Sequence, residues 1–187
     1  MSGTTRNQNP VRKDMADTNT PQNSDEVSAS AAPLVVHAQY IKDLSFENPN
    51  APQSLMPGAK GPDMDININL GARDIKDEQL KDLYEVTLTL TAKATRDDSA
   101  VFVAEISYGA LTSLQGLPEN QHHPLLFIEV PKLIFPFARQ VLSDLTASGG
   151  YPPLLLNPVD FHAMYLERFS KELEASKSES VKNGKAA

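Results

Sequence analysis

The segment Tyr84–Thr95 alternates between apolar and polar side chains along its whole length. A period of two places the apolar groups on one face of a β-strand and the polar groups on the other. Three more segments have strand-like patterns: Leu34–Phe46, Met64–Leu70 and Ala100–Leu114. The sequence therefore predicts a sheet of four strands, with one face in the core and one wetter face.

A helix is predicted to start at about Pro131 or Pro136 and to run to Ser148, because apolar residues recur there at helical spacing. Pro136 fits either the first helical turn or a kink. The pair Gly149-Gly150 is predicted to end this helix as a left-handed cap.

The apolar segment Tyr151–Leu156 contains two prolines and is expected to be an extended connector. A second helix is predicted after it, with Asn157 as N-cap, Pro158 at the first position and Asp160 near the positive end. Strands followed by helices indicate an α+β domain with two helices on one face of an antiparallel sheet.

The run Tyr40–Leu55 reads as a strand that ends in a proline-broken loop. The expected alternation puts one set of side chains on one side, namely Tyr40, Leu44 and Phe46, and a polar set on the other, namely Asp43, Ser45 and Glu47. The prolines in Asn48–Pro52 then stop the strand. Carboxylates beside a long loop with apolar residues suit a surface that contacts other polypeptides.

Composition excludes several classes of function. The 187 residues include 17 Lys and Arg against 24 Asp and Glu, which argues against a nucleic-acid binder. There is no cysteine, and the four histidines lack metal-ligand spacing, so we expect no cofactor and no metal site. No nucleophile motif or phosphate loop occurs, and we expect no enzyme activity. With no signal peptide or membrane span, a soluble protein of the cytoplasm is the simplest prediction.

Residues 1–33 are polar and are expected to form a disordered N-terminal extension, and residues 174–187 a flexible C-terminal tail. Residues 34–173 would form the folded domain. Within it, Val101–Ile106 carries apolar groups on both faces, more than one small domain can cover. We therefore expect a homo-oligomer.

Most of the predicted domain, roughly Val35 to Phe169, resembles the SecB family of protein-export chaperones. The resemblance is carried by the runs YIKDLSFENPNAPQSL, DLYEVTLTLTA, FVAEISYGAL and IFPFARQVLSDLTASGGYPPLLLNPVDF. It implies a dimer of dimers, a homotetramer, in which a long crossover loop joins the first two strands. It also implies an ATP-independent cytosolic holdase that binds unfolded secretory precursors and delivers them to the export motor SecA.

The resemblance also implies site residues. The patch that docks SecA would consist of Asp43, Glu47, Val103 and Glu105. The client-binding groove would be lined by Leu55, Met56, Phe102, Leu111, Met164 and Tyr165. The oligomer interface would include Ala104, Ile106 and Tyr108. Unlike some relatives, this chain has no aromatic residue in the loop segment Leu55–Pro62.

Two alternatives stay open at this point. A chaperone of the same fold could guard a dedicated partner such as an antitoxin, which a restricted client range would indicate. An enzyme or small-ligand protein could use an apolar cavity, although no acid–base or nucleophile constellation supports it.

Overall fold

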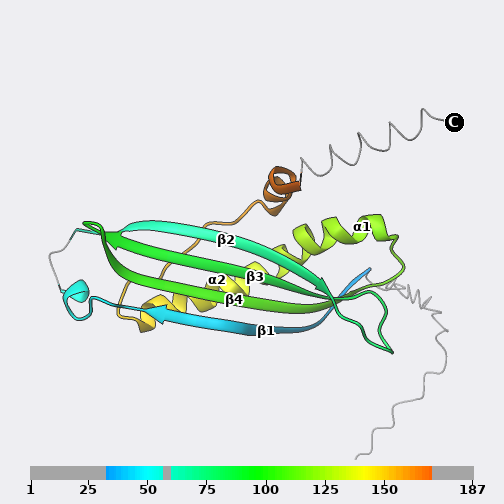
Figure 1. Ribbon diagram of the computed structural model, residues 1–187, viewed down its shortest axis with the longest axis horizontal. Helices are drawn as coiled ribbons and strands as arrows, with labels where there is room; N and C mark the ends of the chain where they lie inside the picture. The colour runs from blue at the N-terminus through cyan, green and yellow to red at the C-terminus, as the bar shows by residue number, and fades with distance from the viewer. Residues whose placement is uncertain (1–32, 57–59, 170–187) are drawn as a thin grey trace, which may run out of the picture. The chain divides into compact units, whose positions relative to one another are not determined.

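A computed structural model describes residues 33–56 and 60–169 of the chain. The predicted tails fall outside these residues, Pro33 apart. The strands are β1 (Leu34–Glu47), β2 (Asp63–Asp74), β3 (Leu83–Arg96) and β4 (Ser99–Leu114). They form one antiparallel sheet in the order β1-β4-β3-β2 (Figure 1). The predicted α+β fold with a four-stranded antiparallel sheet is therefore confirmed.

The first helical region begins earlier than predicted. It consists of α1 (Glu119–Pro124), the π-helical turn η2 (Leu125–Glu129) and α2 (Val130–Ser148). Pro131 lies in the first turn of α2 and Pro136 lies inside it, so the two prolines that suggested a start are accommodated in helical backbone that begins earlier, and so is Pro124 at the end of α1.

The end of α2 is the predicted glycine cap. Gly150 has φ of 89°, Tyr151 N–H donates to Thr146 O, and Gly150 N–H donates to Ala147 O. This pattern is a Schellman motif.

The second helical segment covers residues 161–169 and is capped differently from the prediction. Asp160, not Asn157, caps it, because Asp160 Oδ1 accepts a hydrogen bond of 2.9 Å from the backbone N–H of Ala163. Asn157 and Pro158 belong to the extended connector that precedes this segment.

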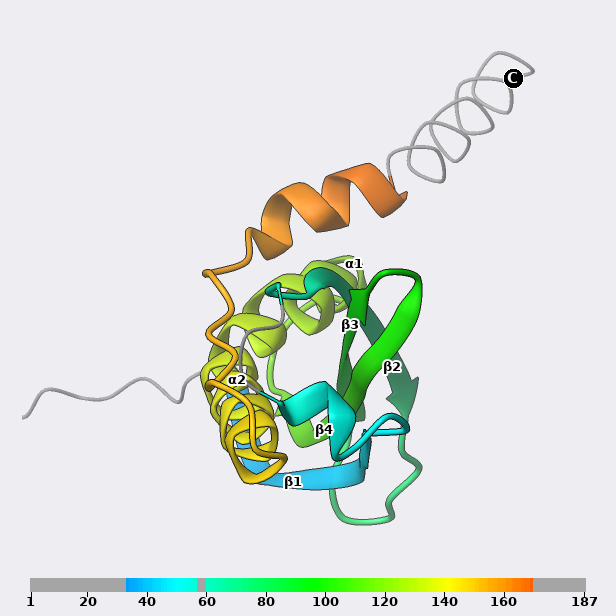
Figure 2. The same ribbon diagram turned by 90° about the vertical axis from the view of Figure 1, so that its left-hand side faces the viewer.

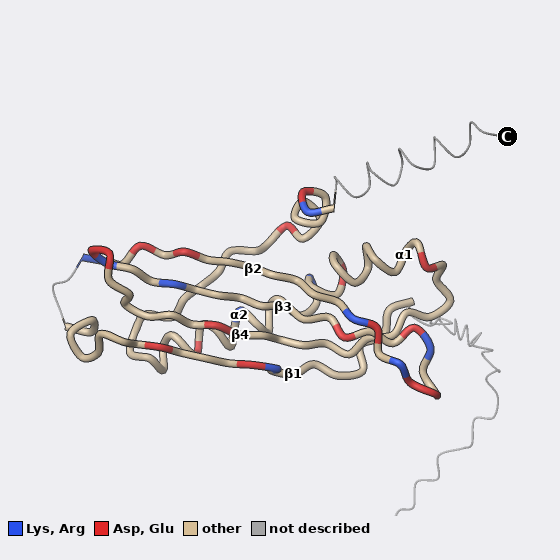
Figure 3. Tube along the Cα trace, in the orientation of Figure 1, with Lys and Arg blue, Asp and Glu red and all other residues tan. Residues whose placement is uncertain are grey.

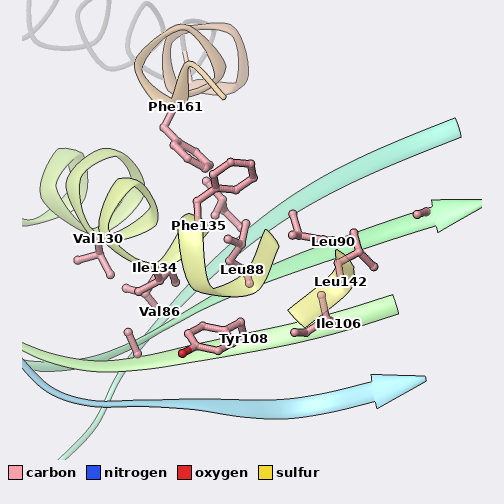
Figure 4. Close-up of a cluster of buried hydrophobic side chains, with 14 of the residues drawn as sticks. Val86, Leu88, Leu90, Ile106, Tyr108, Val130, Ile134, Phe135, Leu142 and Phe161 are labelled. Atoms are coloured by element: carbon pink, nitrogen blue, oxygen red, sulfur yellow. The ribbon is translucent and has the colours of Figure 1, made fainter. Parts of the chain in front are cut away.

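The core lies between α2 and the two central strands, β3 and β4 (Figures 2 and 4). Leu88, Leu90 and Ile106 are fully buried there against Ile134 and Leu142. The helical segment 161–169 packs onto this layer from outside, where Phe161 meets Phe135 edge to face at 5.7 Å between ring centroids.

The core explains a correction to the predicted oligomer interface. Ala104 and Ile106 are 0% exposed and Tyr108 is 9% exposed. Ile106 and Tyr108 lie on the face of β4 that α2 covers (Figure 4), and Ala104, two residues before Ile106, shares that face. They offer almost no surface to a second copy. The prediction was made without knowing which apolar residues of β4 lie on the face that α2 covers.

A bulge in β1 corrects the predicted alternation. The register with β4 shifts between Ile41 and Asp43, so Tyr40 lies opposite Gly109, on the face away from α2. Leu44 and Phe46 lie opposite Ile106 and Ala104, on the helix-covered face.

The bulge lets Tyr40 reach across β4 to Glu85 on β3. A Cβ at Gly109 would lie 2.7 Å from the Tyr40 ring, so only glycine leaves room for this crossing. Tyr40 Oη and Arg73 Nε donate hydrogen bonds to the Glu85 carboxylate, and Lys42 Nζ donates at 2.8 Å. We call these four residues, Tyr40, Lys42, Arg73 and Glu85, the Glu85 cluster.

The Glu85 cluster joins the edge strands β1 and β2 to the centre of the sheet. The Glu85 side chain is only 4% exposed. Hydrogen bonds from Lys42 and Tyr40 lower the pKa of Glu85 to about 2. Burial, together with the bond to Glu85, raises the pKa of Tyr40 to about 12.

We predict that Glu85→Gln lowers the free energy of unfolding near neutral pH by about 2 kcal/mol. This value is reduced because Lys42 and Arg73 are partly exposed, so that water screens their attraction to the Glu85 carboxylate. Because the folded carboxyl titrates below its unfolded counterpart, the difference from wild type should shrink as pH falls from about 4.5 to about 2. Urea unfolding over this range measures it. Exposed Glu78→Gln is the control, and a difference independent of pH would contradict the prediction.

Candidate functional site

The face of the sheet away from α2 carries the predicted acidic patch, which we define as Asp43, Glu47, Val103 and Glu105. Glu47 lies opposite Val103, and Ser45 lies opposite Glu105 on the neighbouring strand. Asp43 is one row further along, opposite Ser107. The structure thus brings the four residues together on β1 and β4, with Asp43 and Glu47 exposed and Val103 and Glu105 half-buried.

Polar side chains of β3 border the acidic patch. Thr91 Oγ1 donates a hydrogen bond of 3.0 Å to Glu105 Oε2, which fixes that carboxylate on the sheet surface. Lys93 is exposed and lies opposite Val103. Figure 3 shows acidic positions along β1 and β4 and a basic position on β3. The patch is therefore suited to a basic partner, with Lys93 as a local opposing charge.

A second surface is an apolar hollow of about 390 Å³ beside the other edge strand, β2. We call it the connector groove; its lining residues are Ile66, Ile68, Leu154, Leu155, Leu156, Asn157, Pro158 and Val159. Leu155 is 77% exposed. The aliphatic walls come from β2 and from the extended connector. The signal in the sequence for this open apolar surface was the connector itself, an apolar segment whose prolines keep it from forming a helix.

The crossover loop, residues 48–62, adds apolar groups at its described end. Leu55, the last residue of the short 3-10 helix η1 (Gln53–Leu55), is 42% exposed, and Met56, which follows it, is 61% exposed. Phe102, predicted to be beside them in the groove, is 4% exposed because it stacks between Phe46 and Tyr151. Phe102 is therefore part of the packing beneath the loop and leaves almost no exposed surface for a client.

The remaining predicted groove residues lie elsewhere. Met164 is half-buried on the segment 161–169, and Tyr165 is 9% exposed, with its hydroxyl 3.0 Å from His123 Nδ1. Leu111 lies opposite Glu85, on the face that bears the acidic patch. The six predicted residues therefore do not form one groove within a protomer, and the connector groove was not predicted from the sequence.

Among the residues that the structure describes, no group of three or more His, Cys, Asp or Glu side chains is arranged to hold a metal ion. Within that same part of the chain, no helix is long and apolar enough to cross a membrane.

An α+β protein with an open aliphatic groove and, on the other face of its sheet, an acidic patch has the surfaces of a polypeptide-binding protein. A family model described as "Preprotein translocase subunit SecB" matches residues 27–172. The chain belongs to the SecB family of protein-export proteins.

Individual relatives agree with this assignment. The chain is 49% identical to the protein-export protein SecB of Maricaulis maris, over 90% of this chain and 95% of the relative. It is 45% identical to the SecB of Bartonella quintana, over 78% and 90% of the two chains. A solved SecB-like chaperone of Mycobacterium tuberculosis, in complex with an antitoxin peptide, has a similar fold, with a TM-score of 0.56 and 18% identity over 69% of this chain and 93% of that chain.

We predict that Leu155→Gln reduces binding of an apolar fluorescent dye several-fold, because it places an amide in the connector groove. Stability should change by less than about 0.5 kcal/mol, since the side chain is mostly exposed. Dye titration and thermal unfolding measure the two effects. Leu166→Gln, at a residue 45% exposed on the segment 161–169, is the matched control. Equal dye loss in both variants would contradict the assignment.

Proposed function

We propose that this protein is an ATP-independent chaperone of the cytoplasm that holds unfolded secretory precursors and delivers them to the export motor SecA. The observation that carries the proposal is the open connector groove, which has aliphatic walls and borders an edge strand. Such a surface accepts many apolar segments without reading a particular sequence. An extended segment could also add backbone hydrogen bonds along β2.

The acidic patch is proposed to dock the motor. The chain carries a formal net charge of −7, which favours association with a basic segment. The patch and the connector groove lie on opposite faces of the sheet and at opposite edges. A client and the motor could therefore occupy one protomer together.

A homotetramer, built as a dimer of dimers, is also proposed. Edge strand β1 exposes Ile41 and Leu44 by 47% and 42%, and α2 exposes Leu133 and Phe137 by 49% and 52%. A second copy that packs on these residues would cover apolar surface that one protomer leaves in water. Several grooves on one oligomer would bind a long client with avidity, about 10²–10⁴ beyond a single site.

No catalytic role is proposed for any residue. The dedicated-partner alternative has less support, because the likeness to the structure with an antitoxin peptide extends to the fold alone, whereas the more similar relatives are protein-export proteins.

We predict that this protein arrests the refolding of a slow-folding, signal-bearing precursor diluted from denaturant, with no nucleotide present. Binding to the unfolded state removes it from the folding equilibrium by mass action. The recovery of native precursor is measured with increasing protein, and arrest should saturate near equal amounts of oligomer and client. Unchanged refolding and aggregation would overturn the general chaperone function. Arrest of a single cognate partner alone would favour the dedicated-partner alternative.

We predict that Glu47→Lys weakens binding to a basic segment of the motor by about tenfold or more, and that client arrest stays intact. Lys93→Glu should strengthen motor binding, since it removes the opposing charge beside the patch. Calorimetry with isolated SecA measures both.

The matched control for the charge reversal is Glu78→Lys, which makes the same change of net charge in the loop between β2 and β3. An equal loss in this control would mean that net charge, not the acidic patch, attracts the motor. Loss of client arrest together with motor binding in Glu47→Lys would contradict the separation of the two surfaces.

A further inference from the structure

The crossover loop rests on three consecutive residues that follow α2: Gly149, Gly150 and Tyr151. We call them the loop socket. A Cβ at Gly149 would lie 2.2 Å from Cζ of Phe46, so the ring at the end of β1 lies directly against glycine backbone. A side chain at this position would force the ring, and the loop after it, away from the helix end.

The second socket residue contacts the loop's short helix η1. Gly150 has φ of 89°, in the region that favours glycine. A Cβ there would lie 3.3 Å from Cδ2 of Leu55, so Leu55 packs closely over the peptide backbone. The Schellman motif that ends α2 therefore also forms the seat for an apolar residue of the loop.

The third socket residue makes the polar contacts. The Tyr151 hydroxyl lies 2.9 Å from Asn48 Oδ1, 3.0 Å from Ser54 Oγ and 3.3 Å from the carbonyl oxygen of Val101. Ser54 Oγ also donates to Asn48 Oδ1 at 2.9 Å. The hydroxyl thus joins the start of the loop, the helix η1 and strand β4.

The surrounding contacts show that the ring and the hydroxyl of Tyr151 have separable roles. The ring lies 4.8 Å from the Phe102 ring and 6.4 Å from the Phe46 ring, centroid to centroid. These contacts do not need the oxygen. The hydrogen bonds to the loop side chains of Asn48 and Ser54 are made by the hydroxyl.

We propose that Tyr151 is a positioning residue for client binding: its hydroxyl holds the first turn of the crossover loop so that Leu55 and Met56 face an incoming unfolded segment. The inference rests on the proposed chaperone function and deepens it. Met56 is 61% exposed, and among the described loop residues the side-chain hydrogen bonds end at Ser54. The socket therefore holds the loop up to the point where its exposed apolar side chains begin.

The test is Tyr151→Phe, which keeps the ring and removes the oxygen. In the η1 turn, backbone N–H groups of Ser54, Leu55 and Met56 donate to Asn50, Pro52 and Gln53. Their hydrogen exchange, measured on the full chain without client, should become up to about tenfold faster, and exchange in α2 and β3 should stay unchanged. Dissociation of a labelled unfolded precursor should accelerate by a similar factor.

The matched control is Tyr84→Phe, which removes a hydroxyl that lies 3.1 Å from His122 Nδ1, far from the loop. It should change neither the exchange of residues 54–56 nor client dissociation. Unchanged exchange at these residues in Tyr151→Phe would overturn the proposal, as would faster exchange throughout the chain. Faster exchange with unchanged client dissociation would overturn the positioning role. Because exchange is measured without client, it reports on the socket even if the chaperone function fails.

Discussion

The uneven covering of one sheet is the constraint on which the other features depend. Helix α2 packs on β4 and β3, the two central strands, and buries their apolar faces completely. One helix row of about 10 Å width cannot also cover both edge strands, which lie roughly 4.8 Å beyond their neighbours on each side. Apolar side chains of β1 and β2 are therefore left partly in water, and these are the strands that border the proposed oligomer surface and the connector groove.

Much of the fold could be predicted because period-two alternation survives in the sequence wherever strands pair regularly. Strands β3 and β4 agree with the prediction within a residue at either end. The start of the first helix was missed because Pro131 or Pro136 was expected to be its first residue, whereas a π-helical turn and α1 precede them and α2 continues through Pro136. Asn157 was a reasonable cap by residue type, but the connector stays extended until Asp160.

The site was less predictable, because pairing and bulges decide which residues meet. The acidic patch was predicted from the resemblance to SecB, and its members come together because β1 beyond the bulge pairs regularly with β4. Tyr40 lies before the bulge, and its face cannot be derived from a fixed period. Glu85 occupies an ordinary polar position of β3, and only the glycine opposite Tyr40 permits the crossing that buries it. The aromatic rings predicted to bind clients, Phe102 and Tyr165, are instead buried supports.

The loop socket and the Glu85 cluster solve the same physical problem at different parts of the chain. A surface that binds varied polypeptides must keep apolar side chains exposed without letting them collapse onto the core. Glycines at residues 109, 149 and 150 let neighbouring rings or aliphatic groups approach the backbone, and tyrosine hydroxyls then fix those segments through polar contacts. The polar contacts on β1 lie on the face of the sheet away from α2, and those of the loop lie beside the end of α2. The exposed apolar residues Ile41 on β1 and Met56 on the loop are not among the residues that make these polar contacts.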